Sequence, residues 1–265
     1  MNILAVDIGN SRIKLALFCN GEKQPTEFID GDNRQSLKKV LTTLWEQVPQ
    51  SRRSTEAKRD GVIVICSVKP KWTELVKELC KNELNEKALE IGIDKDIPLP
   101  LKLCVEYPAN VGVDRVVAAA AAYFVVESSV IVADIGTAIT IDLVDNDGDF
   151  MGGIIAPGFG LSAQALSENT AQLPKVQIKT PTNPVGSNTD DAINNGIYYG
   201  VVGLLETVSR HFAEQIGQWP QMVVTGGNAS IIKKDCQFVD NWVDELVIQG
   251  IVLTYKFYLD KLEIA

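Results

Sequence analysis

The sequence predicts an α/β fold built from two related lobes, each a mixed sheet with helices on its faces. Aliphatic runs that end at Gly, Asn or Ser alternate with segments of helical spacing, which is typical of a sheet covered by helices. One strand-turn-strand segment also occurs twice, which indicates an internal repeat. We expect the two lobes to span residues 1–112 and 113–265.

The first copy of this segment runs from Asn2 to Phe18 and contains Asp7-Ile8-Gly9-Asn10-Ser11 between two apolar stretches. The small and polar residues interrupt β-branched and aliphatic ones, so the segment predicts a strand, a tight turn and a second strand. A carboxylate, a glycine and small polar groups at one end of a sheet are suited to bind a metal-phosphate group.

The second copy runs from Ile131 to Val144, where Asp134 matches Asp7 and Gly136 matches Gly9. A single Asp-x-Gly sequence is common by chance. Two copies, each between apolar strands, make phosphate binding the favoured interpretation.

The rest of the first lobe contains strands where aliphatic residues dominate and helices where apolar residues recur at helical spacing. Pro98 and Pro100 then exclude a central strand or helix, so we expect a connecting segment there. The predicted strands are Lys23–Ile29, Val62–Cys66 and Ala88–Ile91, and the predicted helices are Arg34–Gln47 and Lys71–Asn82.

The second lobe opens with an alanine-rich helix at Val116–Val126 and then the repeated segment. A Pro-, Thr- and Asn-rich stretch from Leu173 to Thr189 indicates a surface loop. Gly158 and Gly160 superficially match a dinucleotide fingerprint, but the βαβ context is missing, and turn and packing roles explain them better. The remaining predicted elements are strands at Phe150–Ala156 and Met222–Thr225 and helices at Asp190–Gln215 and Trp242–Leu259.

Charge and composition limit the possible functions. The 265 residues carry a net charge of −9, which argues against a nucleic-acid partner because phosphate backbones are bound by basic surfaces. Positive charge for a small anionic substrate could come from Arg12, Lys14 and Arg115, whereas the basic run at 52–59 indicates a solvated loop. His211 is the only histidine, so proton transfer would fall mainly to a carboxylate.

The five cysteines include no C-x-x-C pair, so neither a disulfide framework nor a zinc site is indicated. The chain has no apolar run long enough to span a membrane, and Asp7 and Arg12 interrupt the N-terminal run where a signal peptide would be apolar. We therefore expect a soluble, cytoplasmic protein without a membrane partner.

Asp114 is the candidate base. The segment Tyr107 to Arg115 leads into the alanine-rich helix, so Asp114 lies in or just before its first turn. A helix N-terminus stabilises a nearby carboxylate by roughly 0.3–1 kcal/mol, which keeps it ionised and able to accept a proton. From these residues alone, a role of Asp114 as only a helix cap is the favoured interpretation.

Five motifs occur in order along the chain, and together they resemble those of the type III pantothenate kinases, members of the acetate and sugar kinase, Hsc70 and actin superfamily. The resemblance extends from Asn2 to about Leu259. One departure lies in the first motif, where Ser11 replaces the family's usual Thr and keeps its hydroxyl. The motifs are Asp7–Ser11, Gly112-Val113-Asp114-Arg115, Asp134–Ala138, Gly152–Gly158 and Thr225-Gly226-Gly227.

This resemblance implies two actin-like, ribonuclease H-like lobes with ATP in the cleft, and transfer of the γ-phosphate to the 4′-hydroxyl of pantothenate, the first step of coenzyme A synthesis. Asp114 would be the general base. Asp7 would orient Mg²⁺ and phosphate, and Asp134 would bind the monovalent cation, K⁺ or NH₄⁺. The other implied ATP or phosphate contacts are Ile8, Gly9, Asn10, Ser11, Arg12, Lys14, Thr137, Gly226 and Gly227.

The same resemblance implies that Tyr107, Gly112, Val113 and Arg115 hold pantothenate beside Asp114. Thr189 would approach the substrate from a second subunit, which implies a homodimer. Two alternatives stay open: a related kinase acting on a sugar or an acid, and a catalytically idle member acting as a transcriptional accessory factor. The intact carboxylates Asp7, Asp114 and Asp134 argue against the idle member.

Overall fold

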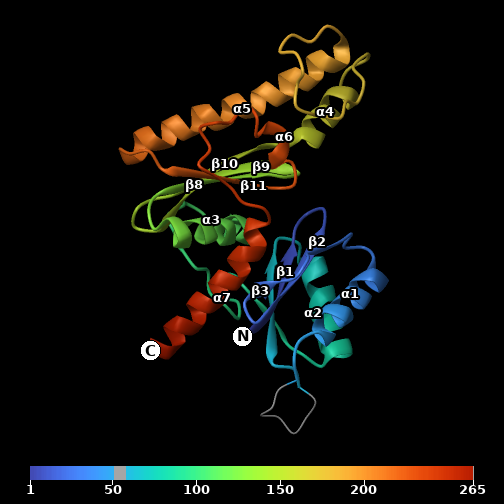
Figure 1. The fold of residues 1–265 in the computed structure, drawn as a ribbon, viewed down its shortest axis with the longest axis vertical. Coiled ribbons are helices and arrows are strands. Elements are labelled where there is room, and N and C mark those ends of the chain that lie inside the picture. Colours follow the sequence, from blue (N-terminus) through green and yellow to red (C-terminus); the bar gives the residue numbers. More distant parts are fainter. Residues whose placement is uncertain (51–57, 265) are drawn as a thin grey trace. The chain divides into compact units, whose positions relative to one another are not determined.

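The computed structural model describes residues 1–50 and 58–264, and it has the predicted α/β character (Figure 1). The chain divides into two compact units. Unit 1 comprises Met1–Leu101, Tyr107–Ala121 and the chain from Val247, and unit 2 comprises Lys102–Glu106 and Ala122–Leu246. This division differs from a single boundary after residue 112, since the last helix belongs to unit 1. Arg52 and Arg53 of the expected basic loop lie outside the described residues.

The sheet of unit 1 has the strand order β3-β2-β1-β5-β6, and β4 also pairs with β2. Strand β1 is antiparallel to β2 and parallel to β5, so its two neighbours run in opposite directions. The strands are β1 (Asn2–Ile8), β2 (Ile13–Cys19), β3 (Glu22–Lys23), β4 (Glu27–Ile29), β5 (Gly61–Ser67) and β6 (Ala88–Glu90).

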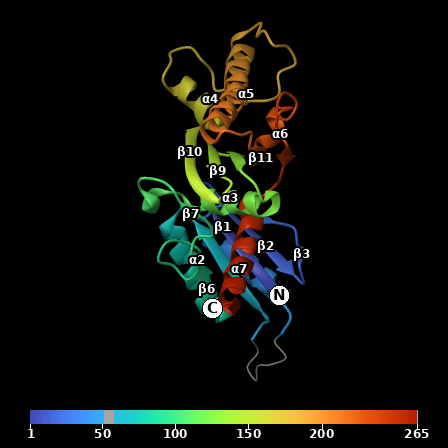
Figure 2. The same cartoon turned by 90° about the vertical axis from the view of Figure 1, so that its left-hand side faces the viewer.

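Helices α1 (Arg34–Glu46) and α2 (Pro70–Leu84) lie side by side against the sheet of unit 1 (Figure 1). Figure 2 shows α2 from another side. Their apolar faces bury Leu37, Leu41 and Val76 in one core with the strands. The other helices of this unit are the short 3₁₀ helix η1 (Pro108–Asn110), α3 (Val113–Val126), which extends past Ala121, and α7 (Leu246–Ile264).

The sheet of unit 2 has the order β12-β11-β8-β9-β10-β7. Strand β8 is antiparallel to β9 and parallel to β11, which repeats the pattern around β1. The predicted internal repeat is therefore confirmed at the level of strand order. The strands are β7 (Lys102–Leu103), β8 (Val130–Ile135), β9 (Ala138–Val144), β10 (Asp149–Pro157), β11 (Gln221–Thr225) and β12 (Asn241–Trp242).

Helices α4 (Phe159–Glu168), α5 (Thr189–Ile216) and α6 (Ala229–Ile232) complete unit 2. The core of this unit contains Ile141, Leu205 and Val224, which come from β9, α5 and β11. Asn188 caps α5 because its side chain accepts a hydrogen bond from the Asp191 amide at 2.9 Å.

Two predicted elements were wrong in detail. The predicted strand Lys23–Ile29 is interrupted into β3 and β4, because Pro25 between them has no N–H to donate to a strand ladder. The predicted helix Trp242–Leu259 instead begins at Leu246 and continues to Ile264. Trp242 pairs with Val224 in parallel strands, and Glu245 has φ 54°, a left-handed conformation that a helix cannot contain.

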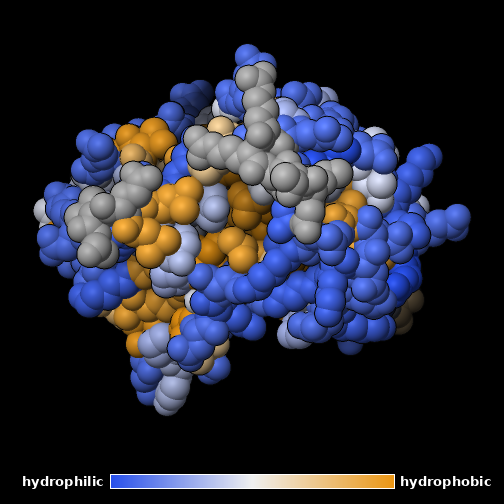
Figure 3. Space-filling view, turned by 90° about the horizontal axis from the view of Figure 1, so that it is seen from below, coloured by the Kyte–Doolittle hydropathy of each residue, from blue (hydrophilic) through white to orange (hydrophobic). Residues whose placement is uncertain are grey.

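Within the described residues, no helix is long and apolar enough to cross a membrane. The five cysteines are free thiols, and Cys66, Cys80 and Cys236 are buried; of these, Cys66 lies in the apolar strand β5, as expected. Figure 3 shows apolar residues gathered on one part of the face viewed, while much of the rest of that face is hydrophilic.

Candidate active site

The candidate site of unit 1 lies where β1 and β5 end. These strands are parallel and in register, with Asp7 opposite Cys66 and Ile8 opposite Ser67. Because the carboxyl ends of parallel strands meet at one edge of a sheet, the turn after β1 and the segment after β5 lie together there. The Val68 amide donates to the Ile8 carbonyl at 3.0 Å and fixes this arrangement.

Asp7 and Lys14 form an ion pair across the β1–β2 hairpin, with Oδ2 and Nζ 3.1 Å apart. The two residues are direct cross-strand partners. The Asp7 side chain is 5% exposed and the Lys14 side chain 31%. Burying a carboxylate without a partner of opposite charge is costly, so Lys14 compensates for the burial of Asp7. The pair is therefore a charged site that is already formed.

Ile8 and Gly9 serve the turn itself. The Ile8 side chain is fully buried in the core, so only its backbone can contribute to a site. The Gly9 N–H donates to the Arg12 carbonyl at 3.1 Å and closes the turn. This amide is thus engaged within the turn instead of directed at a ligand, whereas Asn10, Ser11 and Arg12 are exposed.

Asp114 lies in the first turn of α3, as the sequence predicts. Its Oδ1 accepts a hydrogen bond from the Arg115 amide at 2.8 Å. Burial raises the pKa of the Asp114 carboxyl above its ordinary value, although this hydrogen bond and the charge of Arg115 act in the opposite direction. A carboxylate with a raised pKa is a stronger base than an exposed one.

Asp7 and Asp114 share one neighbourhood. Burial is the main cause that raises the pKa of the Cys66 thiol, and the negative charges of both carboxylates raise it further. The charge of Lys14 lowers the pKa of the Asp114 carboxyl slightly. The structure therefore places both carboxylates, which are far apart in sequence, at the same edge of unit 1.

The segment from Tyr107 to Val113 lies beside Asp114. Tyr107 is 64% exposed and precedes η1. A Cβ atom at Gly112 would lie 2.6 Å from Asp114 Oδ1, so only glycine leaves room for the carboxylate in this position. Gly112 and Val113 also line a cavity of about 400 Å³ in unit 1.

Asp134 occupies the corresponding edge of unit 2. It is opposite Thr225 in the parallel pair β8–β11, so Gly226 follows at the same edge. A Cβ atom would lie 2.4 Å from Asp134 Oδ1 at Gly226 and 3.3 Å from it at Gly136. Two glycines therefore leave bare backbone around the carboxylate.

The turn between β8 and β9 contains Thr137, which is exposed. Gly136 closes this turn, since its N–H donates to the Ala138 carbonyl at 3.1 Å. Gly158 packs directly behind it: a Cβ atom there would lie 2.3 Å from the Gly136 carbonyl oxygen. The close-packing interpretation of Gly158 is confirmed.

Thr189 begins α5 and lies elsewhere in unit 2. It is exposed and lines a cavity of about 720 Å³ together with Leu166, Leu173 and residues of α5. Gly227 is exposed and follows Gly226, and a Cβ atom there would meet nothing within 4 Å.

The structure thus groups the predicted residues into two sets, one for each unit. Asp7, the turn after it, Lys14 and residues 107–115 belong to unit 1, and Asp134, Thr137, Gly226, Gly227 and Thr189 belong to unit 2. The described residues contain no group of three or more His, Cys, Asp or Glu side chains placed to hold a metal ion.

Sequence reasoning missed two features of the unit 1 site. Lys69 Nζ donates to the Asn10 carbonyl at 3.2 Å and so contacts the turn after β1. Glu90 and Lys95 line the cavity beside Val113. Pro70, which begins α2 three residues after the last residue of β5, was the sequence signal that a helix starts just beyond this strand end.

The repeated sheets, each with an acidic turn at its edge, define the actin-like class of folds. A solved structure described as a Baf family transcriptional activator from Campylobacter jejuni superposes with a TM-score of 0.60 at 21% identity, covering 97% of this chain and 99% of that one. MreB5 of Spiroplasma citri bound to ADP superposes with a TM-score of 0.55 at 11% identity, covering 100% and 99%. These likenesses show the fold.

The chain belongs to the type III pantothenate kinase family, whose model matches residues 3–211. A type III pantothenate kinase of Dehalococcoides mccartyi strain BAV1 is 34% identical over 254 residues, covering 96% of this chain and 95% of that protein. One from Brevibacillus brevis is 34% identical over 257 residues, covering 96% and 98%. The similarity therefore extends over almost the whole length of both chains.

Proposed function

We propose that this chain transfers the γ-phosphoryl group of ATP to the 4′-hydroxyl of pantothenate, which gives 4′-phosphopantothenate and ADP and opens coenzyme A synthesis. The observation that carries the proposal is the grouping of the partly buried Asp114 carboxylate with the Asp7–Lys14 ion pair at one edge of unit 1, in a chain of this family. Phosphoryl transfer needs mainly positioning and charge stabilisation, which this site offers without histidine.

Asp114 is the general base in this proposal. The 4′-oxygen of pantothenate forms a bond to the γ-phosphorus as the bond between that phosphorus and the bridging oxygen breaks, and the electron pair of the broken bond leaves with ADP. The hydroxyl proton passes to the Asp114 carboxylate and then to solvent. In this proposal Arg115, whose charge acts on Asp114, is an anion partner for pantothenate beside the base.

ATP enters the reaction with a divalent cation, which we assign to Mg²⁺. Asp7 orients the metal-phosphate group, and Lys14 adds positive charge beside it. Asn10, Ser11 and Arg12 are exposed on the same turn and contact phosphate oxygens. From unit 2, Thr137, Gly226 and Gly227 contact ATP.

A monovalent cation fits the Asp134 carboxylate, because Gly136 and Gly226 leave bare backbone beside its Oδ1 atom. Carboxylate and backbone oxygens are suitable ligands for such an ion. When bound, the ion would supply fixed positive charge toward the phosphates. Asp134 itself needs no proton transfer in this role.

Pantothenate is held beside Asp114 by Tyr107, Gly112, Val113 and Arg115. Thr189 contributes from a second copy of the chain, so the active assembly is a homodimer. A role as a transcriptional accessory factor is not favoured, since the likeness to the Campylobacter jejuni protein concerns the fold alone.

The proposal is tested by pantothenate-dependent ADP release with ATP and Mg²⁺, with and without K⁺. We expect turnover with pantothenate, none with hexoses or acetate, and loss of turnover when a large organic cation replaces K⁺. Absence of ADP release with pantothenate, Mg²⁺ and K⁺ together would refute the function.

Asp114→Asn separates catalysis from folding. We expect kcat to fall by about 10²–10⁴ with little change in KM, the range for a lost general base. The free energy of unfolding at pH 7 should rise, because the folded state raises the pKa of this carboxyl and therefore disfavours its ionised form. Near-normal turnover would remove Asp114 from the mechanism.

A further inference from the structure

Lys69 lies between the end of β5 and the start of α2, at the edge of unit 1 that also holds the turn after β1. Its backbone is extended, with φ −131° and ψ 90°, and the backbone rather than the side chain caps the helix. The Lys69 carbonyl accepts the amides of Trp72 and Thr73 at 3.0 and 3.1 Å. The helix start is therefore satisfied by main-chain groups, and the Lys69 side chain is left for another role.

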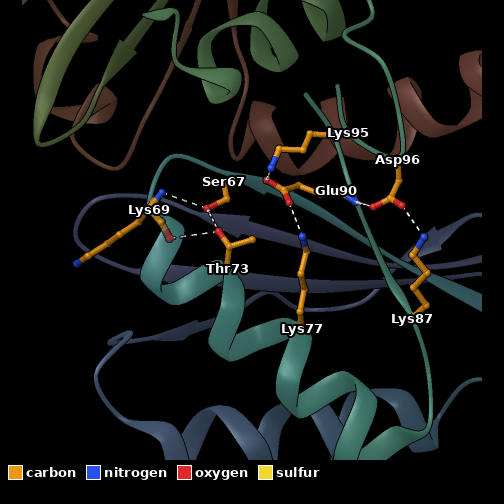
Figure 4. A network of polar contacts seen from close by, with 8 residues as sticks. All are labelled: Ser67, Lys69, Thr73, Lys77, Lys87, Glu90, Lys95 and Asp96. Atoms are coloured by element: carbon orange, nitrogen blue, oxygen red, sulfur yellow. Dashed lines mark hydrogen bonds and ion pairs between the residues drawn. The ribbon is translucent and has the colours of Figure 1, made fainter. Parts of the chain in front are cut away.

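The base of this side chain is held rigidly. The Lys69 amide donates to Ser67 Oγ at 3.1 Å, and the Thr73 hydroxyl donates to the same oxygen at 2.6 Å. Thr73 is 3% exposed, so this link lies inside the unit. Figure 4 shows these contacts, with the Lys69 side chain directed away from Glu90. The backbone of Lys69 thus fixes the direction in which its side chain leaves.

The ammonium group is held at two further points. Lys69 Nζ donates to the Asn10 carbonyl at 3.2 Å and lies 3.1 Å from the centroid of the Trp72 ring, where the face of the indole attracts a cation. The ring itself is fixed, because its Nε1 donates to Asp32 Oδ1 at 3.3 Å and a Cβ atom at Gly31 would lie 2.1 Å from it. The ammonium group therefore lies between a fixed ring and the turn after β1.

This contact determines how the turn faces an anion. The Gly9 amide closes the turn on the Arg12 carbonyl, so the orientation of the next peptides decides what the turn presents. A peptide group is planar and trans, so the Ser11 N–H points opposite to the Asn10 carbonyl that Lys69 holds. Phosphate oxygens bind amide N–H groups and are repelled by carbonyl oxygens. Holding the carbonyl on the Lys69 side therefore fixes the side on which the amide lies.

Resting on the proposed function, we propose that Lys69 is a positioning residue for the phosphates of ATP. It keeps the peptide between Asn10 and Ser11 in one orientation, in which phosphate oxygens meet the Ser11 amide and not the Asn10 carbonyl. Lys69 thus acts on ATP through the turn after β1, which it links to the start of α2.

Steady-state kinetics with varied ATP test this role. Lys69→Met should raise KM for ATP by about 5- to 30-fold, the loss expected when a charge-assisted hydrogen bond no longer holds the turn. KM for pantothenate should change by less than about twofold, because only the phosphate side of the site is altered. Inorganic tripolyphosphate, which carries phosphates without adenosine, should inhibit Lys69→Met correspondingly more weakly than it inhibits the wild-type chain.

Lys69→Arg and Lys71→Met are the matched variants. Arginine keeps a positive charge that can donate to the carbonyl and stack on Trp72, so Lys69→Arg should keep KM for ATP within about threefold of the wild-type value. Lys71 is exposed in the first turn of α2, so Lys71→Met removes a nearby charge and should leave both KM values unchanged. Equal rises of both KM values in Lys69→Met, an unchanged KM for ATP, or a comparable rise in Lys71→Met would overturn the proposal.

Hydrogen exchange without ligand tests the geometry apart from activity. In Lys69→Met the amides of residues 9–12 should exchange at least about threefold faster, because the turn has lost its link to the start of α2. In Lys71→Met these amides should exchange as in the wild-type chain. Unchanged exchange in Lys69→Met would also overturn the proposal.

Failure of the proposed function is distinguishable from failure of this inference. If the wild-type chain turns over pantothenate and Lys69→Met keeps its KM for ATP, the function stands and the inference fails. If the wild-type chain does not turn over pantothenate, calorimetric binding of ATP with Mg²⁺ decides the question. Affinity weaker by about 5- to 30-fold in Lys69→Met supports the role of Lys69, whereas equal affinities, or no binding by the wild-type chain, refute it.

Discussion

Gly226 offers a sharp test of how the acidic turn of unit 2 is held. Its φ is +104°, a conformation that side chains rarely adopt. A Cβ atom there would lie 2.4 Å from Asp134 Oδ1 and 2.5 Å from the Ile135 nitrogen. Gly226→Ala must therefore strain the backbone and displace either the carboxylate or the β8 backbone.

These two effects set the expected loss of stability. A non-glycine residue in such a conformation costs about 1–3 kcal/mol, and overpacking a close contact costs a further 1–3 kcal/mol or so. Part of the overlap is relieved if the Asp134 side chain rotates, but the Ile135 backbone cannot move as easily. We expect Gly226→Ala to lower the free energy of unfolding by about 2–5 kcal/mol.

Urea denaturation without ligands measures this loss, with Gly227→Ala as the control. A Cβ atom at Gly227 meets nothing within 4 Å, so that variant should change stability by less than about 1 kcal/mol. Gly226→Ala should also raise the K⁺ concentration needed for half-maximal activity. Equal stabilities of the two variants would refute the account of this glycine.

Further predictions concern individual charges and hydrogen bonds. As the proposed base, Asp114 would have to be ionised, and burial raises the pKa of its carboxyl. The value of kcat/KM should therefore fall about tenfold per pH unit below that pKa, beginning at a higher pH than for an exposed carboxyl. A profile set by an ordinary carboxyl pKa would contradict this. Lys14→Met removes the cation beside Asp7. Because Lys14 is partly exposed, the free energy of unfolding measured with urea should fall by only about 1–3 kcal/mol. An unchanged midpoint would show that the pair is not stabilising. Tyr198→Phe loses a 2.8 Å hydrogen bond from a fully buried residue to Asp235 and should lower the free energy of unfolding by about 1–3 kcal/mol. Tyr199→Phe, at a 39% exposed residue, should lower it little. Equal effects of the two variants would refute the argument.

The repeated hairpins were predictable because their signal is local. Aliphatic runs on both sides of Asp7-Ile8-Gly9 and of Asp134-Ile135-Gly136 fix strand, turn and strand within the segments 2–19 and 130–144. The start of the last helix was not predictable in the same way. Trp242 has a side chain suited to a helix or a strand, and its pairing with Val224 in β11 is a tertiary effect.

The candidate site was partly predictable for a similar reason. Asp114 at the start of an alanine-rich helix and the acidic turn after β1 are readable from sequence, but the parallel pairing of β1 with β5 is not. That pairing is what brings Ser67 and the start of α2 to the same edge as Asp7. Lys95, nineteen positions before Asp114, likewise lines the same cavity as Val113 only because the loop after β6 is closed by the hydrogen bond from the Gly92 amide to the Ile97 carbonyl.

The two acidic turns have diverged in chemistry while keeping their backbone plan. Four residues, Gly9 to Arg12, lie between the last cross-strand pair, Ile8 and Ile13, in unit 1, but only three, Gly136 to Ala138, lie between the last pair, Ile135 and Ile139, in unit 2. The cross-strand neighbour of Asp7 is Lys14, whereas that of Asp134 is Thr140. A lysine beside the carboxylate suits a site for phosphate oxygens, and a neutral hydroxyl there suits a site for a cation. The same strand order can thus support a site for an anion in one unit and a site for a cation in the other. The repeat therefore predicts two sites, but these two sites are not equivalent.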